Sequence, residues 1–273
     1  MTQLQSFGRP LVMIGCGNMA GAILSRWLQC GLDPAQVTVV DPHRAEIQVG
    51  VTLLAALPAR LPDDAVVVLG VKPQLLPEVT PVLAPLLGSG NLVISMLAGV
   101  TVDQLRLSLG AAPGFVRIMP NTPVALGQGV CAFYVDARTA GGWETAAQTL
   151  LAPLGLSERI ATEDAFDLVT ALTGCGPAFV YRFIDAMKRG AMELGMGGDQ
   201  AARLALATVR GAANLAGSVT EDPAVLADRV ASKGGMTREG LDVLDADDRL
   251  VRLMADTLRA ARDRGKELNA LSG

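Results

Sequence analysis

Two glycines close to the N-terminus stand where a chain could bind a phosphate group. An apolar run at residues 11–14 is followed by Gly15 and Gly17, and an amphipathic pattern begins at Asn18. Glycines in such a turn let the backbone bend sharply and approach a ligand, and the N-terminus of the following helix favours an anion. The pattern predicts a strand, a tight turn and a helix that together bind the pyrophosphate of a dinucleotide. A glycine turn that only packs a helix closely against a strand would give the same pattern.

An acidic residue supports the dinucleotide interpretation. A second apolar run at residues 37–40 ends in Asp41, at the spacing of about 20 residues at which a carboxylate meets the adenosine ribose diol. Asp41 therefore favours NADH and opposes the 2′-phosphate of NADPH by like charge. His43 and Arg44 follow, and they could bind that phosphate if the Asp41 side chain turned away. The sequence leaves NADH and NADPH both open.

A second group of small and polar residues lies nearer the C-terminus. Ser232, Gly234, Gly235 and Thr237 separate two expected helices. Glycines there allow backbone N–H groups at a helix N-terminus, beside the two hydroxyls, to bind a small carboxylate. The alternative is an ordinary turn between helices in which the glycines form a C-cap.

The composition excludes several classes of protein. A chain of 273 residues suggests two domains, and 50% hydrophobic against 18% charged residues indicates a large apolar surface, so we expect an oligomer. A net charge of −4 provides no basic surface for nucleic acid. No apolar run reaches the length of a membrane span and residues 1–9 lack a signal-type pattern, which favours a cytoplasmic protein without a membrane partner.

Metal chemistry and triad hydrolysis are not expected. The four cysteines, Cys16, Cys30, Cys131 and Cys175, form no Cys-x-x-Cys pair, and His43 is the single histidine. These residues offer neither a set of zinc ligands nor a Ser/His/Asp triad, and they give no pattern typical of disulfides.

The elements that must position the first group of residues alternate between strands and helices. Further apolar runs occur at residues 51–54, 64–71, 91–96 and 114–118, and helices are expected at 45–50, at 75–87 and from an N-cap at Thr101 to Leu109. This order predicts an α/β Rossmann fold with a doubly wound sheet. The loops after the strands, each of which could also be an ordinary turn, would share the edge where ligands bind: residues 15–19, 41–44, 71–74, 98–99 and 120–123.

The character of the chain changes after two smaller strand-like pieces. These lie at residues 127–134 and 156–161, with a helix at 142–151 between them. Helices are then expected at 162–171 with Thr162 as N-cap, at 178–194 after a break at 174–177, at 199–216 with Asp199 as N-cap, from Pro223, and at 247–268. We therefore predict a dinucleotide-binding domain at 1–161 and an all-helical domain at 162–273, whose apolar surface would pack against another subunit.

Six segments give the chain a family resemblance. They are residues 14–19, 71–74, 98–101, 119–123, 173–178 and 232–237, and the last three in this order are the most specific. On these segments the chain resembles pyrroline-5-carboxylate reductase, the last enzyme of proline biosynthesis. The resemblance implies a Rossmann domain, a helical domain that interlocks with its partner in a homodimer, and in some members a decamer of five dimers. It also implies hydride transfer from nicotinamide C4 to the imine carbon of 1-pyrroline-5-carboxylate.

The resemblance extends to individual residues. Together with Asp41 and Arg44, the expected cofactor-binding residues are Gly15, Cys16, Gly17, Asn18, Met19, Val71, Lys72, Pro73 and Ala98. Substrate binding would involve Glu163, Ser232, Gly234, Gly235, Met236 and Thr237, with the Thr237 hydroxyl bonded to the ring nitrogen as the catalytic contact. Because a protonated imine is already an electrophile, this reaction needs positioning more than a strong acid or base.

The chain departs from the family pattern at three positions. Cys175 stands where serine is usual, and Lys233 and Met236 stand where proline and threonine or alanine are common. Two other interpretations are open: a related dehydrogenase or imine reductase acting on a related small acid, and a regulatory or scaffold protein that binds the dinucleotide without hydride transfer.

Overall fold

The structure is a computed structural model that describes residues 4–110, 114–139 and 142–271. It divides into two compact units, one of Met1–Cys175 with Ala261–Gly273 and one of Gly176–Ala260. The outermost residues of the two predicted domains, 1–3 and 272–273, lie outside the described residues. Each unit is described by itself.

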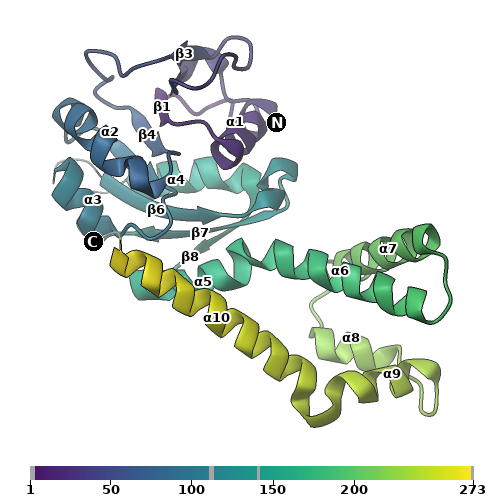
Figure 1. Ribbon diagram of the computed structural model, residues 1–273. Helices are drawn as coiled ribbons and strands as arrows, with labels where there is room; N and C mark the ends of the chain where they lie inside the picture. The colour runs from purple at the N-terminus through teal and green to yellow at the C-terminus, as the bar shows by residue number, and fades with distance from the viewer. Residues whose placement is uncertain (1–3, 111–113, 140–141, 272–273) are drawn as a thin grey trace. The chain divides into compact units, whose positions relative to one another are not determined.

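The first unit is built on an eight-stranded sheet in the order β3-β2-β1-β4-β5-β6-β7-β8 (Figure 1). Strands β1 to β6 are parallel, β7 is antiparallel to β6, and β8 is parallel to β7. The chain runs outward from β1 to β3 and then returns to the other side of β1 at β4, so the strand order reverses between β1 and β4. The strands are β1 (Leu11–Ile14), β2 (Val37–Val40), β3 (Thr52–Leu54), β4 (Val66–Leu69), β5 (Leu92–Ser95), β6 (Gly114–Pro120), β7 (Gly129–Val135) and β8 (Gly155–Arg159).

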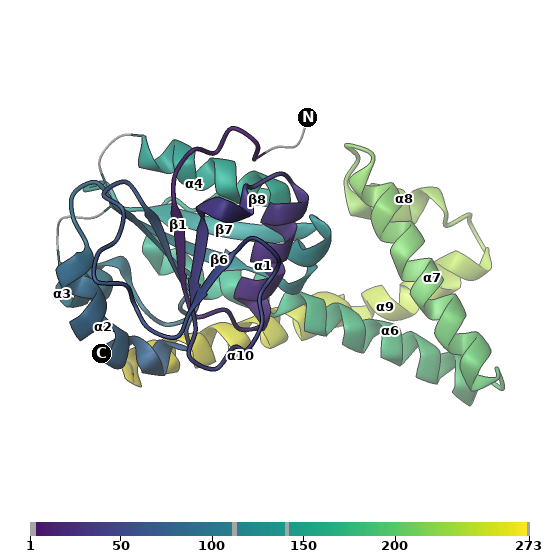
Figure 2. The same ribbon diagram turned by 90° about the horizontal axis from the view of Figure 1, so that it is seen from above.

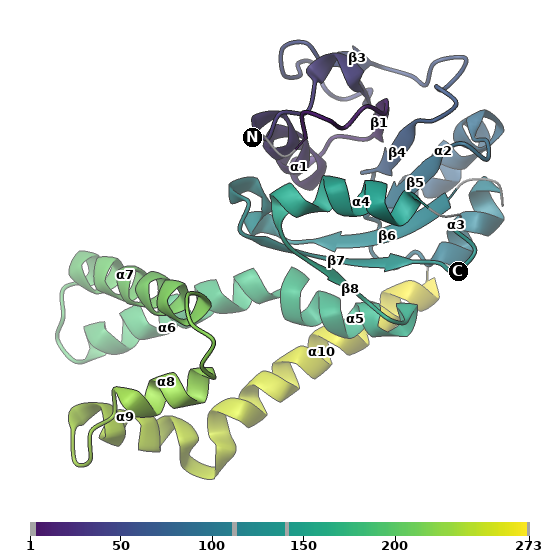
Figure 3. The ribbon, with the colours of Figure 1, turned by 180° about the vertical axis from the view of Figure 1, so that it is seen from behind.

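Helices cover both faces of this sheet. Leu11 and Met13 of β1 face one core, which includes apolar side chains of α1 (Asn18–Gln29) and α4 (Trp143–Leu151). Val12 and Ile14 face the other core, with α2 (Leu76–Leu83) and α3 (Val102–Leu109). Figures 1 and 2 show α2 and α3 together on one side, and α4 is seen over β6 and β7 in Figure 3. Because successive side chains of a strand point to opposite faces, a strand buried on both faces is apolar throughout.

Short helical turns complete the connections in this unit. The predicted helix at 45–50 is wrong, because this segment forms turns. Arg44 Nε donates to the Glu46 carbonyl, and Gly50 has a φ of 89°.

The predicted cap of α3 is confirmed, since Thr101 and Gln104 form a reciprocal capping box. The short turns are η1 (Pro34–Gln36), η2 (Pro73–Leu75), η3 (Ala84–Leu86), η4 (Thr122–Leu126) and η5 (Ala152–Leu154).

The predicted helix at 162–171 is a longer and irregular segment. It consists of η6 (Glu163–Ala165), α5 (Phe166–Val169) and the π-helical η7 (Thr170–Gly174). Thr162 is the N-cap residue, as predicted, although its side chain makes no capping hydrogen bond. The N–H of Cys175 donates to the Thr170 carbonyl at 2.9 Å, which ends the π-helical turn.

The second unit is helical. In Figures 1 and 3, α6 (Gly176–Glu193) and α7 (Gly198–Gly217) lie side by side, and α8 (Pro223–Arg229), α9 (Met236–Asp245) and η8 (Ala246–Asp248) follow before α10 (Arg249–Leu271). The N-cap of α7 is Gly197, so the predicted cap at Asp199 is wrong, and Asp199 lies in the first turn. Large apolar side chains of this unit are exposed, among them Val180, Phe183, Leu204, Leu215 and Val251.

Candidate active site

A cavity of about 1120 Å³ lies at the reversal of strand order between β1 and β4. Its lining comes from the loops after β1, β2, β3 and β4 and from the start of α2: Gly15–Gly17, Asp41–His43, Ala55–Leu57, Gly70–Lys72 and residues 74–82 in part. In an open parallel sheet, ligands bind outside the carboxyl ends of the strands at such a reversal. The predicted ligand edge of the sheet therefore carries a cavity of the size that a cofactor needs.

The glycine loop requires glycine for a steric reason. Gly15 has a φ of 82°, and a Cβ atom there would lie 2.7 Å from Val71 Cγ1 and 2.9 Å from the Val71 nitrogen. Gly15 N–H donates to the Val40 carbonyl at 2.8 Å, which holds the loop against β2. The N-cap of α1 is Gly17, which has no side chain to occupy the space at the start of the helix. The first-turn N–H groups of α1 can therefore donate hydrogen bonds to a pyrophosphate.

Two ionisable side chains hold the Cys16 peptide on both sides. Asp41 Oδ2 accepts from the Cys16 N–H at 2.9 Å, and Asp41 Oδ1 accepts from the His43 N–H at 2.9 Å. The Arg44 side chain donates through Nη1 to the Cys16 carbonyl oxygen. Burial raises the pKa of the Cys16 thiol, with Asp41 adding to this and Arg44 opposing it, so Cys16 is a neutral packing side chain at pH 7. Its backbone, not its thiol, shapes the loop.

The predicted cofactor residues fall into two groups. Those that line the cavity are Gly15, Cys16, Gly17, Asp41, Val71 and Lys72. The others, Asn18, Met19, Arg44, Pro73 and Ala98, lie outside that lining. Met19 lies in the first turn of α1 and packs against the core, and Pro73 is the first residue of η2. Ala98 is exposed in the loop after β5, ahead of the capping box of α3.

Sequence reasoning missed two features near these loops. Leu57 and Val79 both line the cavity. Leu57 lies in the loop after β3, which could have been expected from its place at the ligand edge, whereas Val79 lies in α2 and could not. Arg117 lies in β6 with a side chain only 3% exposed, and its guanidinium stacks 4.4 Å from the centre of the Phe166 ring. The signal for Arg117 is a single charge inside an apolar strand, which requires a buried partner.

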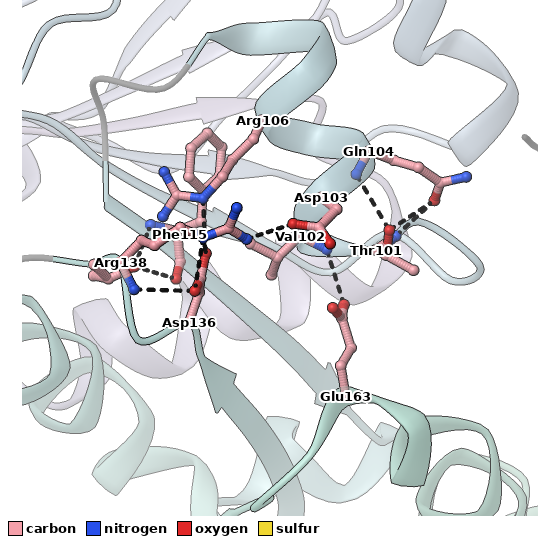
Figure 4. Close-up of polar contacts among 10 residues, drawn as sticks. Thr101, Val102, Asp103, Gln104, Arg106, Phe115, Asp136, Arg138 and Glu163 are labelled. Atoms are coloured by element: carbon pink, nitrogen blue, oxygen red, sulfur yellow. Dashed lines mark hydrogen bonds and ion pairs between the residues drawn. The ribbon is translucent and has the colours of Figure 1, made fainter.

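That partner is Glu163, which was expected to lie near the substrate. Glu163 Oε1 accepts from Arg117 Nη1 at 2.9 Å and from the Val102 N–H at 2.9 Å. Figure 4 shows Glu163 directed at the N-terminus of α3, where the Thr101–Gln104 capping box also lies. A carboxylate at this position is favoured by the helix dipole. Glu163 therefore joins α3 to β6 within the first unit.

A second charged cluster joins Asp103 and Arg106 of α3 to Asp136 and Arg138, which follow β7. Arg106 donates to Asp136 at 2.7 Å, Arg138 bonds both Asp136 and Asp103, and these contacts are drawn in Figure 4. Burial alone would raise the pKa of Asp136. Hydrogen bonds from the Arg138 backbone N–H and the Arg106 side chain outweigh burial and hold that pKa below its usual value. The loop that carries Ala98 is thus followed by a helix fixed by ionic contacts on two sides.

In the predicted loop at residues 120–123, the Asn121 side chain is bonded within the first unit. Asn121 is buried, its Oδ1 accepts from the Val130 N–H at 2.8 Å, and its Nδ2 donates to the Thr173 carbonyl at 3.0 Å. The side chain therefore connects β7 to η7.

The predicted substrate residues lie in the second unit, apart from Glu163. Gly235 is the N-cap of α9, Met236 is 93% exposed, and Thr237 is an exposed residue of the first helical turn. Gly234 has a φ of 69°, and a Cβ atom on Gly235 would lie 2.5 Å from Ser232 Oγ. Since the first N–H groups of a helix have no carbonyl partner within it, Met236 and Thr237 present donors next to the Thr237 hydroxyl. This arrangement suits a small carboxylate.

Within residues 4–110, 114–139 and 142–271, no three His, Cys, Asp or Glu side chains gather where they could bind a metal ion. In that same part of the chain, no helix is long and apolar enough to cross a membrane.

Comparisons with known proteins agree with the fold. Residues 163–268 match the family model described as pyrroline-5-carboxylate reductase dimerisation, and residues 10–99 match that described as NADP oxidoreductase, coenzyme F420-dependent. The pyrroline-5-carboxylate reductase of Pseudomonas aeruginosa is 34% identical over 263 residues, covering 94% of this chain and 96% of that protein.

Solved structures give the same result. A pyrroline-5-carboxylate reductase from Coxiella burnetii is 31% identical, with a TM-score of 0.88 over 95% of this chain and 98% of that chain. The Plasmodium falciparum pyrroline carboxylate reductase, solved with NADP bound, is 22% identical with a TM-score of 0.78 over 96% and 98% of the two chains, and it shares the fold. The predicted Rossmann fold followed by an all-helical dimerisation domain is confirmed. The chain belongs to the pyrroline-5-carboxylate reductase family and is an NAD(P)H-dependent oxidoreductase.

Proposed function

We propose that this chain reduces 1-pyrroline-5-carboxylate to L-proline with NAD(P)H. The observation that carries the proposal is the cavity at the β1–β4 reversal, lined by Gly15, Gly17, Asp41 and Lys72, in a chain of this family. When bound there, the cofactor supplies a hydride. Addition of that hydride to the imine carbon moves the C=N π electrons to the protonated ring nitrogen and leaves a secondary amine.

The cofactor would be held mainly by backbone groups of the first unit. The turn at Gly15 and the open start of α1 at Gly17 leave space and N–H donors for the pyrophosphate. Asn18 and Met19 continue that helix, and Arg44 supports the turn through the Cys16 carbonyl. We assign the remaining cofactor contacts to Val71, Lys72, Pro73 and Ala98, which follow β4 and β5 at the same edge.

The substrate would be held by the start of α9. The N–H groups that follow Gly234 and Gly235 would bind the carboxylate, and the Thr237 hydroxyl would accept a hydrogen bond from the protonated ring nitrogen. Ser232 lies beside Gly235, and Lys233 adds a positive charge to the same loop. Glu163 would act near this reaction through the Val102 N–H and Arg117, as a positioning residue for the loop before α3.

We also propose how the chain is organised and where it works. Residues 1–161 would form the dinucleotide-binding domain and residues 162–273 the substrate-binding and dimerisation domain of a homodimer, which could assemble further into a decamer. The exposed apolar side chains of α6, α7 and α10 support a subunit interface. We further propose a cytoplasmic enzyme without a membrane partner, and its net charge of −4 provides no basic surface for nucleic acid.

The test measures the oxidation of NADH and of NADPH, by the fall in absorbance at 340 nm, in the presence of 1-pyrroline-5-carboxylate. The wild-type chain should oxidise at least one cofactor and form L-proline. Thr237→Ala should lower kcat/KM by roughly 10- to 100-fold, the value of one lost hydrogen bond to a charged group, and Thr237→Ser should recover most of it. Thr149→Ala, on α4, serves as a control that also removes a hydroxyl from a helix.

Two other outcomes would overturn the proposal. Poor turnover of 1-pyrroline-5-carboxylate with good turnover of a bulkier imino acid would indicate a related reductase. Cofactor binding without any hydride transfer would indicate a regulatory dinucleotide-binding protein.

A further inference from the structure

The two residues that could decide between NADH and NADPH are both fixed in the structure. Asp41 follows β2 directly and lines the cavity, and its own N–H donates to the Leu54 carbonyl at 2.9 Å. Its position at the end of the second strand is where the adenosine ribose lies in a dinucleotide-binding sheet. The group at that position meets either a ribose diol or a 2′-phosphate.

The Asp41 carboxylate is directed toward the cavity loop and does not turn away. Oδ2 accepts from the Cys16 N–H and Oδ1 from the His43 N–H, both at 2.9 Å. A carboxylate has about four acceptor positions, so each oxygen can accept one further hydrogen bond. Two neighbouring acceptors fit the two hydroxyls of a ribose diol, whereas a 2′-phosphate would bring a second anion to the same place.

Arg44, the nearby cation that could compensate that charge, is engaged elsewhere. Its Nη1 donates to the Cys16 carbonyl and its Nε to the Glu46 carbonyl at 2.9 Å. A Cβ atom on Gly21 would lie 3.4 Å from Nη1, so the guanidinium rests against α1, and Arg44 is outside the lining of the cavity. The arginine supports the glycine loop and does not face the ribose position.

The other basic side chains at the cavity are less suited to the 2′-phosphate. Lys72 follows β4, which is separated from β2 by β1, and adjacent strands lie about 4.8 Å apart. His43 lines the cavity with an exposed side chain, and its backbone N–H is bonded to the same Asp41 carboxylate. Asp41 is therefore the charged group best fixed at this position.

From this geometry we infer that the chain uses NADH in preference to NADPH and that Asp41 is the specificity-determining residue. The inference rests on the proposed reductase function for its substrate, but it concerns dinucleotide binding alone. Arg44 is assigned a positioning role that serves both cofactors equally, because it contacts the glycine loop common to both.

The experiment measures dissociation constants of NADH and NADPH by titration calorimetry, in the absence of substrate. The wild-type chain should bind NADH at least tenfold more tightly than NADPH. Asp41→Asn, which keeps the side-chain shape and removes the charge, should reduce that ratio to threefold or less by tightening NADPH binding and weakening NADH binding. Asp63→Asn removes an exposed carboxylate, 96% exposed and outside the cavity lining, and should leave the ratio unchanged.

Arg44→Met separates the two roles of the arginine. If Arg44 positions the loop, both dissociation constants should rise by the same factor and the ratio should stay constant. A selective loss of NADPH binding in Arg44→Met, or equal wild-type affinities, would overturn the inference while leaving the reductase function intact. Binding of neither dinucleotide to the wild-type chain would overturn both. Activity with NADPH preferred would overturn the cofactor inference alone.

Discussion

Arg117 and Glu163 form an ion pair of 2.9 Å between a buried strand and the segment that follows the sheet. The Arg117 side chain is 3% exposed and that of Glu163 is 19% exposed, so water screens the pair only in part. The same Glu163 oxygen accepts the Val102 N–H, so one carboxylate serves both the buried cation and the N-terminus of α3. Removing it would take away the carboxylate that pairs with the buried charge of Arg117.

Glu163→Ala should lower the free energy of unfolding by about 3 kcal/mol, because breaking a buried pair from one side costs roughly 3–5 kcal/mol and partial exposure reduces the loss. Chemical denaturation would measure it, with the exposed Glu158→Ala on β8 as the control. In an Arg117→Met background the further loss from Glu163→Ala should be below about 1 kcal/mol, the size of the remaining Val102 bond. An undiminished loss in that background would contradict the pairing.

Gly15→Ala should impair both stability and cofactor binding. At a φ of 82° a side chain costs about 1–3 kcal/mol, and the new Cβ would also meet Val71 at 2.7 Å. Because the loop must move to accept it, the dissociation constant of the preferred dinucleotide should rise at least tenfold. Gly8→Ala, where a Cβ meets nothing within 4 Å, is the matched control for calorimetry and denaturation. Unchanged cofactor affinity in Gly15→Ala would show that the turn does not shape the site.

Parts of this site could be predicted from the sequence and others could not. The buried parallel strands were found because both of their faces are covered, which makes them continuous apolar runs. The prediction of a helix at 45–50 was wrong because this segment forms turns, in which Arg44 bonds the Glu46 carbonyl. Hydrophobic periodicity carries no information about such a contact. The orientation of Asp41 could not be decided, since it depends on the Cys16 N–H, which belongs to a loop 25 residues earlier. Arg117 carried a signal, but its partner Glu163 lies 46 residues away.

Asp136 should make stability depend on pH in the acid range. Arg138 and Arg106 hold its pKa in the folded chain below its usual value despite burial, whereas the unfolded chain titrates near the ordinary value of about 3.9. The stabilisation is therefore complete above that value and is lost as the pH falls through the folded pKa. Asp136→Asn should cost about 3–5 kcal/mol at pH 7, and the difference from wild type should shrink as the pH falls below the ordinary aspartate value of about 3.9. A difference that stays constant from pH 7 to pH 3 would contradict this account, and Asp63→Asn should show little loss at either pH.

The proposed homodimer can be tested on α6. Phe183 is 47% exposed there, among the apolar side chains that the chain leaves uncovered. Phe183→Glu would place a charge in an apolar interface, where leaving it unpaired costs several kcal/mol, so the mass measured by light scattering should fall to that of one chain. Leu107→Glu replaces an 87% exposed leucine on α3 of the first unit and should leave the mass unchanged. A Phe183→Glu protein that remains dimeric would place the interface elsewhere.

Gly235 provides a test of the substrate loop that leaves the cofactor unit untouched. A Cβ atom at Gly235 would lie 2.5 Å from Ser232 Oγ and 3.1 Å from the Ser232 carbonyl oxygen, so Gly235→Ala must turn the Ser232 hydroxyl away and shift the backbone at the start of α9 slightly. Because the N–H donors there are proposed to bind the substrate carboxylate, KM for 1-pyrroline-5-carboxylate should rise by tenfold or more, about 1.4 kcal/mol, while the dissociation constant of the cofactor stays unchanged. Gly240→Ala lies on the same helix, where a Cβ meets nothing within 4 Å, and should leave both constants unchanged while adding up to about 1 kcal/mol of helix stability. Equal effects of the two substitutions on KM would mean that the start of α9 does not bind the carboxylate.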